Sequence, residues 1–477
     1  MPIKLRVVSG IVSLFLLVSF ATSPHLTYVL FPKIGINNMD WIQMENYDKN
    51  GFSLAFIMNI KNILIKKPEN YNKETLLKNF DTFASSRPVS TNNSASYTDK
   101  TVKPNVIMIM SEAFWDPTLM KKVSFSSEPI PTFKELCSKY SSGYLLSPSY
   151  GGGTSNVEFE ILTGNSVSFL PDGSNPYQQY IYKETPSLAS IFSDNGYSSI
   201  AVHSYFKWFF NRNIVYNLIG FKKFIGMDDF TNSKNKGFYI SDDDFSKKII
   251  SEYKKSKKPA FIYAISMQNH GPYDIKRYNN SFDITVSGKA LSAQNLSILQ
   301  DYTQGIHDAD KSLKTVISYF RKVKEPTVIV FFGDHLPLLG SNFSVYREAG
   351  FIKADKPDWS NEEYKKMYSP PYVVWTNYSH GKEDVQTIGT SFFGGYLLDF
   401  VGIKKPQYFE FLKQLSAQLP GDTKYLKVSS DNSLYSGADL PKNLKALEDS
   451  YWLFEYDLLF GKGYLKDLFF NTTKQKK

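Results

Sequence analysis

The stretch Thr327-Val328-Ile329-Val330-Phe331-Phe332-Gly333-Asp334-His335 decides the fold class of this chain. An unbroken run of apolar, mostly β-branched and aromatic residues is typical of a strand buried on both faces, as in a parallel sheet. The run ends in an Asp-His pair, and a carboxylate beside an imidazole is half of a site for a divalent metal. We therefore predict a buried strand that presents metal ligands at its carboxyl end.

Two further apolar runs end in the same way. Asn105–Met110 is followed by Ser111 and Glu112, and Ala260–Ile265 leads into His270. In open α/β sheets, sites form at the carboxyl ends of the parallel strands. We therefore expect Glu112 and His270 to meet the Asp-His pair at one place.

Strand-like and helix-like segments alternate through the middle of the chain. Such alternation predicts an α/β fold with a large, mostly parallel central sheet and helices on both faces. Besides the three runs above, the predicted strands are Ser199–His203 and Tyr372–Thr376, and the predicted helices are Ser187–Asn195, Ala290–Val323 and Ser391–Val401.

The N-terminal residues predict export from the cytoplasm. Lys4 and Arg6 precede an apolar segment from Val7 to Ala21, which fits either a signal peptide or a membrane anchor. We therefore assign residues 1–24 to a signal or transmembrane segment. The catalytic part is expected at the extracellular face of the cell membrane, either anchored there or released after cleavage.

The rest of the chain divides by composition. Residues 25–83 form a predicted stem with one amphipathic helix, Gly51–Lys66, and residues 84–104 form a polar linker. Residues 105–420 form the predicted catalytic domain. Residues 421–477 form a C-terminal extension packed on it, with a final helix at Asn443–Phe460.

Charge and cysteine content limit the partners. The formal charge of +9 comes largely from Lys-rich stretches such as Lys247-Lys248, which indicate solvated helix faces. The functional alternative is attraction to an anionic membrane surface or a phosphorylated substrate. No basic motif with a groove-reading element is present, so we expect no nucleic-acid partner. Cys137 is the single cysteine, which excludes an intrachain disulfide.

Thr154 is the candidate nucleophile. It follows Gly151-Gly152-Gly153, whose small residues let the backbone approach a ligand, and it precedes a helix-like segment. The free N–H groups of a helix N-terminus favour a phosphate, and a bound metal would activate the hydroxyl. A glycine turn followed by a capping threonine is the structural alternative.

The oxygen and nitrogen donors of the chain suit manganese, magnesium or zinc. The predicted metal ligands are Glu112, Thr154, Asp334 and His335.

The segment from His203 to Arg212 supplies candidate substrate contacts. Arg212 is suited to a bidentate grip on a phosphate, and His203 and His270 are suited to donate hydrogen bonds or to act as acid or base groups. The aromatic residues between them, which include Phe210, form either core or a pocket wall.

These motifs, in this order, resemble the lipoteichoic acid synthase family of the alkaline phosphatase/sulfatase superfamily. The matching pieces are Ser111-Glu112, Gly152-Gly153-Thr154, His203 through Asn211-Arg212, Asn269-His270 and Gly333-Asp334-His335.

The resemblance implies an alkaline phosphatase-like fold and a manganese ion bound by the four predicted ligands. It also implies that Thr154 is the catalytic threonine and that His203, Arg212 and His270 hold a phosphoglycerol group. Phe210 stands where those synthases carry a tryptophan, and it would keep an apolar wall there. Leu336–Gly340 replaces a polar stretch of those synthases that includes a serine in contact with substrate.

The implied function is an exported phosphoglycerol transferase in the synthesis of lipoteichoic acid or a related envelope polymer. The donor would be a phosphatidylglycerol-like lipid, and the acceptor a glycerol-phosphate or glycan hydroxyl. The alternatives are a phosphodiesterase, another phospholipid head-group transferase or a hydrolase of the sulfatase superfamily. A further alternative is a catalytically inert surface protein that binds lipid or teichoic polymer.

Overall fold

The computed structural model describes residues 2–23, 30–36, 43–60, 65–85, 103–353, 356–437 and 439–470. The chain forms two compact units. The smaller contains residues 1–70 and 169–175, and the larger contains residues 71–168 and 176–477. Most of the predicted linker, residues 86–102, lies outside the described residues.

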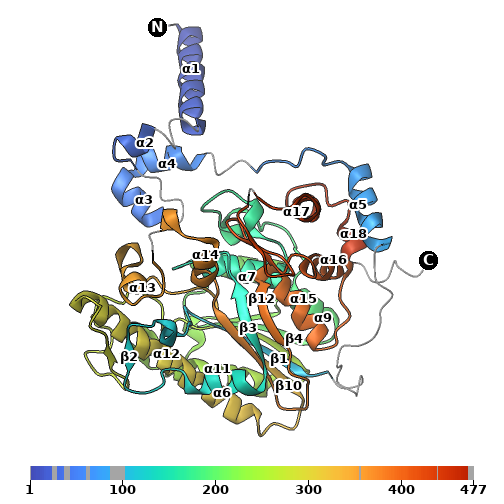
Figure 1. Cartoon of the computed structure of the whole chain (residues 1–477). Helices are drawn as coiled ribbons and strands as arrows, with labels where there is room; N and C mark the ends of the chain where they lie inside the picture. The colour runs from blue at the N-terminus through green and yellow to red at the C-terminus, as the bar shows by residue number, and fades with distance from the viewer. Residues whose placement is uncertain are drawn as a thin grey trace. The chain divides into compact units, whose positions relative to one another are not determined.

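An eight-stranded sheet organises the larger unit (Figure 1), in the order β12-β3-β11-β10-β1-β8-β4-β5. Among these described strands only β11 runs against the others. The predicted α/β fold with a mostly parallel sheet is therefore confirmed. The strands are β1 Asn105–Ser111, β3 Ser141–Leu146, β4 Ser198–His203, β5 Lys223–Ile225, β8 Ala260–Ile265, β10 Thr327–Gly333, β11 Pro371–Thr376 and β12 Asp384–Gly389.

Helices cover both faces of the sheet, as predicted. Phe192 of α9 stacks on Phe261 of β8 with ring centroids 4.2 Å apart, on one face. On the other face, Phe133 of α6 lies 6.1 Å from Phe331 of β10. The first face carries α7 Thr154–Thr163, α9 Leu188–Asp194 and α15 Thr390–Phe400, and the second carries α6 Pro131–Lys139, α11 Asp242–Lys255 and α12 Ala293–Phe320.

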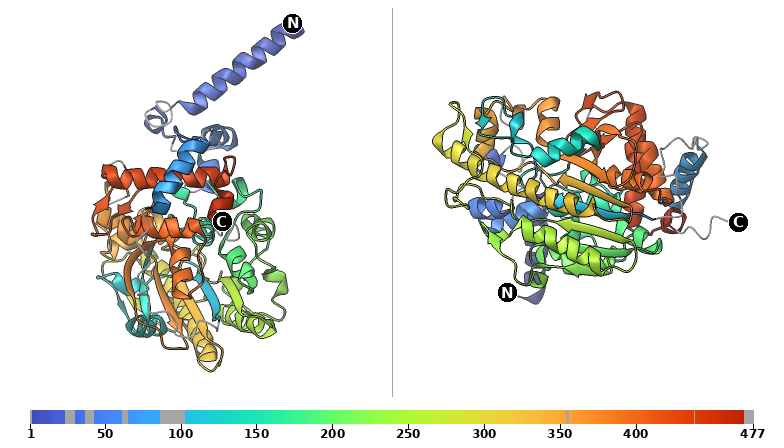
Figure 2. Two further views of the ribbon diagram at one scale, coloured as in Figure 1. Left: turned by 90° about the vertical axis from the view of Figure 1, so that its right-hand side faces the viewer. Right: turned by 90° about the horizontal axis from the view of Figure 1, so that it is seen from below.

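Helices from the two ends of the larger unit pack together. Tyr71 donates a hydrogen bond of 2.7 Å to Asp457, and the rings of Phe83 and Phe411 meet edge to face at 5.6 Å. Figure 2 shows the blue α5 beside the red C-terminal helices. Residues 71–83 of the predicted stem are therefore part of the larger unit. The helices are α5 Lys73–Ser85, α16 Gln407–Ser416, α17 Lys442–Leu459 and α18 Lys466–Phe470.

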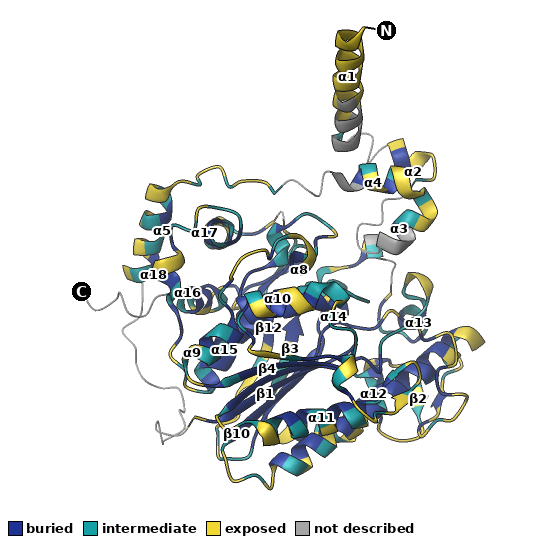
Figure 3. Cartoon of the chain, turned by 180° about the vertical axis from the view of Figure 1, so that it is seen from behind, coloured by how far each residue is buried: buried dark blue, intermediate teal, exposed yellow. Residues whose placement is uncertain are grey.

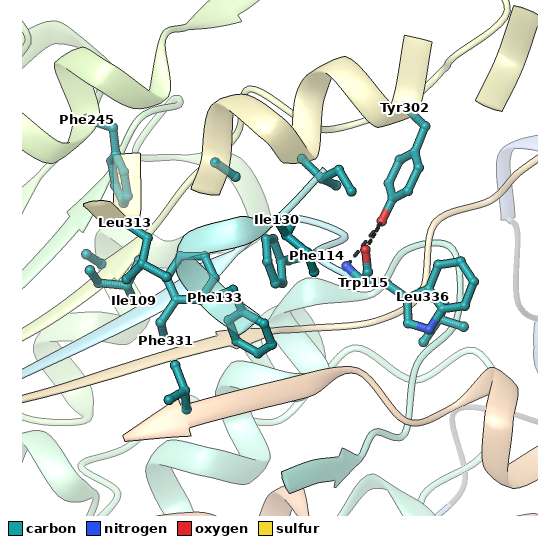
Figure 4. Close-up of a cluster of buried hydrophobic side chains, with 14 of the residues drawn as sticks. Ile109, Phe114, Trp115, Ile130, Phe133, Phe245, Tyr302, Leu313, Phe331 and Leu336 are labelled. Atoms are coloured by element: carbon teal, nitrogen blue, oxygen red, sulfur yellow. Dashed lines mark hydrogen bonds between the residues drawn. The ribbon is translucent and has the colours of Figure 1, made fainter. Parts of the chain in front are cut away.

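The core of the larger unit lies between the sheet and the α6, α11 and α12 layer. Figure 3 shows the strands as almost wholly buried, with exposed positions on α11. Alternate residues of the central strands, such as Ile107 and Ile109, point into this cluster. Tyr302 of α12 lies at the edge of this cluster, where its hydroxyl accepts from the Trp115 N–H and lies within donating distance of the Trp115 carbonyl oxygen, both at 3.1 Å (Figure 4). The same hydroxyl lies 2.9 Å from the carbonyl oxygen of Ala113. These contacts fix the segment after β1, which carries part of the site.

The smaller unit contains α1 Ile3–Thr22, α2 Phe31–Lys33, α3 Gln43–Asn50 and α4 Phe52–Ile60. The predicted stem helix corresponds to α4, and residues 61–64 lie outside the described part of the chain. Among the described residues, no helix combines the length and the apolar character that crossing a membrane requires.

The remaining elements of the larger unit are short. They are β2 Ser124–Phe125, α8 Pro176–Gln179, α10 Arg212–Leu218, β6 Asn235–Lys236, β7 Tyr239–Ile240, β9 Val286–Ser287, α13 Ser344–Glu348, α14 Asn361–Met367, β13 Gly421–Asp422, β14 Lys427–Val428 and β15 Leu434–Tyr435.

Candidate metal centre and phosphate site

Three predicted metal ligands meet at the carboxyl edge of the sheet. β1 and β10 are parallel neighbours with Ser111 opposite Gly333, so the residues that follow them emerge side by side. One ligand atom from each of Glu112, Asp334 and His335 lies within 4.8 Å of the others, and all three side chains are buried.

Backbone hydrogen bonds hold two of these ligands in place. Asp334 Oδ1 accepts from the N–H groups of Ala113 and His335, both at 2.9 Å. The Nδ1 atom of His335 lies 2.9 Å from the carbonyl oxygen of Leu336, which assigns the ring proton to Nδ1. Nε2 is then left with a lone pair, 3.3 Å from Asp334 Oδ2.

The buried acidic and imidazole groups of this cluster would be stabilised by a bound cation. Asp334 Oδ2 and His335 Nε2 are buried and have no hydrogen-bond partner among the described residues. Burial and the nearby Asp334 carboxylate raise the pKa of Glu112 to about 8. Unpaired buried charge is costly, and a divalent cation would remove that cost. The donor set therefore fits manganese, magnesium or zinc.

Thr154 lies beside this cluster. It is the first residue of α7, and its hydroxyl lies 3.5 Å from Glu112 Oε2. The preceding Gly153 has φ +83°, and a Cβ there would stand 2.8 Å from Ser149 Oγ, so only glycine fits without strain. The glycine loop thus places the threonine hydroxyl next to the predicted metal ligands.

The strand that delivers this loop is absent from the sequence-based prediction. β3 runs parallel to β12 and next to β11, and its carboxyl end leads into the glycine loop. Its sequence, Ser-Ser-Gly-Tyr-Leu-Leu, has too few apolar residues to give a clear strand pattern. Gly143 is required by packing, because a Cβ there would lie 1.8 Å from the carbonyl oxygen of Val385.

Arg212 and His203 also come together, but with a partner that the sequence did not indicate. Arg212 Nε donates to both carboxylate oxygens of Glu158 at 3.1 and 3.2 Å, and its Nη2 donates to the same carboxylate. Tyr216 donates a further hydrogen bond of 2.5 Å to Glu158. The bidentate edge of Arg212 is therefore occupied by Glu158 in this structure.

The remaining guanidinium nitrogen of Arg212 points elsewhere. Nη1 lies 3.3 Å from His203 Nε2 and 3.4 Å from the carbonyl oxygen of Phe209. The centroid of the Phe210 ring lies 5.2 Å from the guanidinium carbon, within cation–π range, so the ring lies beside the arginine. Burial and the Arg212 charge hold the pKa of His203 well below its usual value, so this histidine is neutral.

His270 is held at the same edge by its backbone. Its ring Nδ1 lies 2.8 Å from the carbonyl oxygen of Gly271, and Arg277 donates to its carbonyl oxygen at 2.8 Å. Burial lowers the pKa of His270. With the proton on Nδ1, its Nε2 is a hydrogen-bond acceptor rather than an acid. Tyr239 lies between His270 and Tyr205, with ring centroids 5.8 Å from each.

Sequence reasoning missed two charged residues that support the site. Glu158 lies four residues after Thr154, so helical spacing on one face was the available signal. Arg277 is paired with Asp301 at 2.5 Å and is buried. No local motif marks that pair, because its partners are brought together only by the packing of α12.

Comparisons with known proteins agree with this geometry. Residues 104–403 match the protein family described as Sulfatase. A putative cyclic beta-1,2-glucan modification protein of Rhizobium meliloti is 35% identical over 435 residues, which are 91% of this chain and 65% of that protein. The lipoteichoic acid synthase of Staphylococcus saprophyticus is 27% identical over 244 residues, 49% of this chain and 36% of that protein.

A solved structure matches at the level of the fold and the sequence. The phosphoglycerol transferase GacH of Streptococcus pyogenes, in complex with sn-glycerol-1-phosphate, is 25% identical with a TM-score of 0.68. The match covers 85% of this chain and 99% of that one. The predicted resemblance to lipoteichoic acid synthases is confirmed. The chain spans less than two thirds of the length of the two curated relatives named above.

Proposed function

Because the chain belongs to the sulfatase family, we propose that it is a metal-dependent phosphoglycerol transferase with Thr154 as its nucleophile. The observation that carries this proposal is the position of the Thr154 hydroxyl, 3.5 Å from Glu112 within a buried cluster of metal-binding groups. The phosphoglycerol transferase GacH, with its matching fold, supports the transferred group.

The residues that would hold the metal are Glu112, Thr154, Asp334 and His335. A bound divalent cation would offset the negative charge of the phosphate oxygens and favour the ionised threonine. Thr154 Oγ1 attacks the phosphorus of a phosphatidylglycerol-like lipid. The new Oγ1–P bond forms as the P–O bond to diacylglycerol breaks, and the hydroxyl proton ends on the diacylglycerol oxygen. An acceptor hydroxyl then displaces Thr154, and its proton returns to the threonine.

Neutral and cationic groups would hold the phosphoglycerol. Arg212 would contribute the N–H groups of Nη1, which lies 3.3 Å from His203 Nε2. His270 offers the Nε2 lone pair to a glycerol hydroxyl, because its Nδ1 is engaged with Gly271. Phe210 forms an apolar wall beside the glycerol. The two histidines therefore act by binding and orientation, a narrower role than acid or base catalysis.

A glycan hydroxyl is the acceptor that the comparisons favour. The Rhizobium meliloti relative is named as a glucan modification protein, and it aligns with most of this chain. A glycerol-phosphate chain is the other acceptor, as the name of the Staphylococcus saprophyticus relative suggests. In either case the reaction would modify a cell-envelope polymer at the extracellular face of the membrane, with the protein anchored there or released.

Water is the acceptor in the second candidate function, a phosphodiesterase. The same arrangement of Thr154 and the metal ligands would serve both reactions, because only the second nucleophile differs. A sulfatase is disfavoured, since those enzymes use Cys or Ser in a Cys/Ser-x-Pro-x-Arg setting, whereas this chain reads Thr154-Ser155-Asn156-Val157-Glu158.

The test uses the full chain in mixed micelles with fluorescent phosphatidylglycerol and Mn²⁺. Diacylglycerol release is measured for the wild type and for Thr154→Ala, with intact-mass analysis for a phosphoglycerol adduct. A cyclic glucan and water are compared as acceptors by product mass. We expect release to fall by at least about 10³-fold in Thr154→Ala, because the nucleophile is lost.

Thr163→Ala is the matched control, since this buried threonine ends the same helix and donates to the Phe159 carbonyl at 2.7 Å, away from the metal ligands. Its folded fraction should release diacylglycerol like the wild type. Release that persists in Thr154→Ala would contradict the proposed nucleophile. Metal binding without cleavage of any phosphodiester would favour the inert binding protein.

A further inference from the structure

We propose that Glu158 is a positioning residue that aims Arg212 at the phosphate in the transition state. This inference deepens the proposed function and rests on it, because it concerns the same site. Glu158 would touch neither the metal nor the substrate. It would act through the orientation and the charge of the arginine alone.

The contacts of Glu158 leave little freedom to Arg212. Both side chains are buried, with Glu158 at 0% and Arg212 at 1% exposure. Nη2 of the arginine donates to Glu158 Oε1 and Nε donates to Oε2 at 3.2 Å, so the guanidinium plane is fixed by two parallel contacts. Tyr216, on the same short helix as Arg212, fixes the second carboxylate oxygen.

Glu158 lies on the same helix as Thr154 and contacts Arg212, so it connects the arginine to the proposed nucleophile. Thr154 and Glu158 are four residues apart on α7, so their side chains lie on one face of the helix. Arg212 begins α10, a different element that follows β4. The Glu158–Arg212 pair therefore sets the distance between the threonine and the guanidinium across two elements.

The pair also selects which N–H groups reach the substrate. Among the described residues, Nη1 contacts only His203 Nε2 and the carbonyl oxygen of Phe209, at 3.3 and 3.4 Å. Both contacts are long, and a phosphate oxygen would compete for the same N–H groups. We therefore expect Arg212 to donate to a phosphate oxygen through Nη1 alone, in a fixed direction. The sequence had predicted a bidentate contact with the phosphate.

A fixed donor of this kind acts mainly on the transition state. Negative charge on the phosphoryl oxygens shifts during attack, and preorganised donors stabilise it without reorganisation. A loosened arginine would still attract the anionic substrate by its charge, so the affinity for the ground state would change less. Loss of Glu158 is therefore expected to lower kcat more than it raises KM.

The experiment compares Glu158→Gln with the wild type as full-length, Mn²⁺-loaded protein. Gln keeps one oxygen that can accept from Arg212 but loses the charge and the second oxygen. Steady-state kinetics are measured with phosphatidylglycerol micelles and with an aryl phosphodiester. Orthovanadate binding is measured by calorimetry as a readout besides activity, since vanadate imitates the five-coordinate phosphorus. Glu158→Asp, which keeps the charge, is the rescue variant.

The control is Asp422→Asn, which breaks another buried ion pair of the larger unit. Asp422 and its partner Lys427 are 1% and 3% exposed, and their strands β13 and β14 belong to a separate three-stranded sheet. Both substitutions should lower the unfolding temperature. Only the change at Glu158 should alter catalysis by the folded fraction.

We expect Glu158→Gln to lower kcat by about 100-fold with KM changed less than about 3-fold, and to weaken vanadate binding by at least about 10-fold. Glu158→Asp should fall between that variant and the wild type. Unchanged kcat and vanadate affinity in the folded fraction would overturn the proposal, as would an equal loss in Asp422→Asn. If Glu158→Gln does not fold, Glu158→Asp is judged by the same criteria.

The two proposals fail in different ways. A wild type that cleaves the aryl phosphodiester but not phosphatidylglycerol would reject the lipid donor, while the Glu158 comparison would still stand on the aryl substrate and on vanadate. A wild type that binds no vanadate would overturn the positioning role directly, because no phosphate-like ligand would then meet Arg212.

Discussion

Individual hydrogen bonds decide which atoms of the site are available. Asp334 uses one carboxylate oxygen for two backbone N–H groups, and His335 uses Nδ1 for a backbone carbonyl. Each residue therefore has one remaining atom, and these two atoms face each other without a protein partner among the described residues. Such second contacts orient metal ligands and set the histidine tautomer. The same argument applies to Arg212, because the contacts of Glu158 with Nε and Nη2 leave only Nη1 for other partners.

The first prediction concerns the metal. Chelation by EDTA should abolish diacylglycerol release, and Mn²⁺ should restore it. Asp334→Asn should weaken Mn²⁺ binding by at least about 100-fold, because a charged ligand is replaced by a neutral one. Calorimetry measures the affinity. Asp310→Asn is the control, since this buried carboxylate caps α6 through the Phe133 N–H at 2.7 Å. Equal Mn²⁺ affinity in Asp334→Asn would refute the assigned ligand set.

The second prediction concerns the glycine loop. Gly153 and Gly402 both have positive φ, at +83° and +72°, but only at Gly153 would a Cβ meet another atom within 3 Å. Each Gly→Ala change should cost about 1 kcal/mol or more from backbone strain. Gly153→Ala should in addition lower kcat, because Ser149 or Thr154 must move. Urea unfolding and kinetics separate the two effects, and normal activity of Gly153→Ala would contradict the role given to the loop.

Helix α7 connects the site to the rest of the larger unit. One face carries Thr154 toward Glu112, a predicted metal ligand, and Glu158 toward Arg212. Glu160 accepts from the Val167 N–H at 2.9 Å and from the hydroxyl of Ser166 at 3.1 Å. Glu455 of α17 accepts from the Ser166 N–H at 2.6 Å. Helix α17 is thus connected to α7 through buried carboxyl groups.

The third prediction uses the pH dependence of this connection. Burial raises the pKa of Glu160 from 4.5 to about 7. The folded state therefore binds more protons than the unfolded state between these two values, so stability falls as the pH rises through this window. The shift is worth about 3 kcal/mol for this buried group. Glu160→Gln removes the titration, so its unfolding free energy should improve relative to the wild type from pH 4.5 to 7.

Urea unfolding at several pH values measures this difference. Glu135→Gln, at an exposed position of α6, is the control and should follow the wild-type slope. A constant difference between Glu160→Gln and the wild type across the window would show that Glu160 does not titrate there.

At the scale of the whole molecule, the sheet order gathers the site. Strands β10, β1, β8 and β4 are consecutive neighbours, so their carboxyl ends bring Asp334, Glu112, His270 and His203 to one edge. β3 lies across the antiparallel β11 and adds Thr154 from the other side. α5, α16, α17 and α18 pack together within the same unit. The larger unit therefore begins before the predicted linker.

The fourth prediction tests this boundary. A chain starting at residue 68 keeps α5, whereas one starting at residue 86 loses it. Leu76 and Phe83 of α5 are buried, so loss of the helix should destabilise the catalytic unit by about 3–5 kcal/mol. Thermal unfolding of both chains gives the comparison. The longer chain with Leu76→Ala is the matched control, with a smaller loss, and equal stability of the two chains would show that α5 contributes nothing.

The sequence alone was sufficient for the local features. Runs such as Ala260–Ile265 are apolar enough to be buried strands wherever they pack, and the structure gives that strand with the same bounds. The Asp334-His335 pair and Glu112 follow such strands directly, so a parallel sheet brings them to one edge. The position where a helix begins also depends on neighbouring residues. At the start of α9, the Ser187 hydroxyl accepts a hydrogen bond from the Ala189 N–H at 3.0 Å.

The tertiary structure decided the features that depend on distant partners. β3 is recognisable only through its pairing with β11 and β12, because its own sequence is half polar. The hydrogen bonds between Arg212 and Glu158 join residues 54 positions apart. Because they occupy Nε and Nη2 of the arginine, only Nη1 is left to donate to a substrate. Residues 71–85 belong to the larger unit because α5 contacts α16 and α18 near the other end of the chain. Whether a segment forms a strand, and which ligand atoms it carries, depend on a few neighbouring residues. The pairing of strands, the protonated nitrogen of each histidine and the boundary of the larger unit depend on which surfaces the fold buries together.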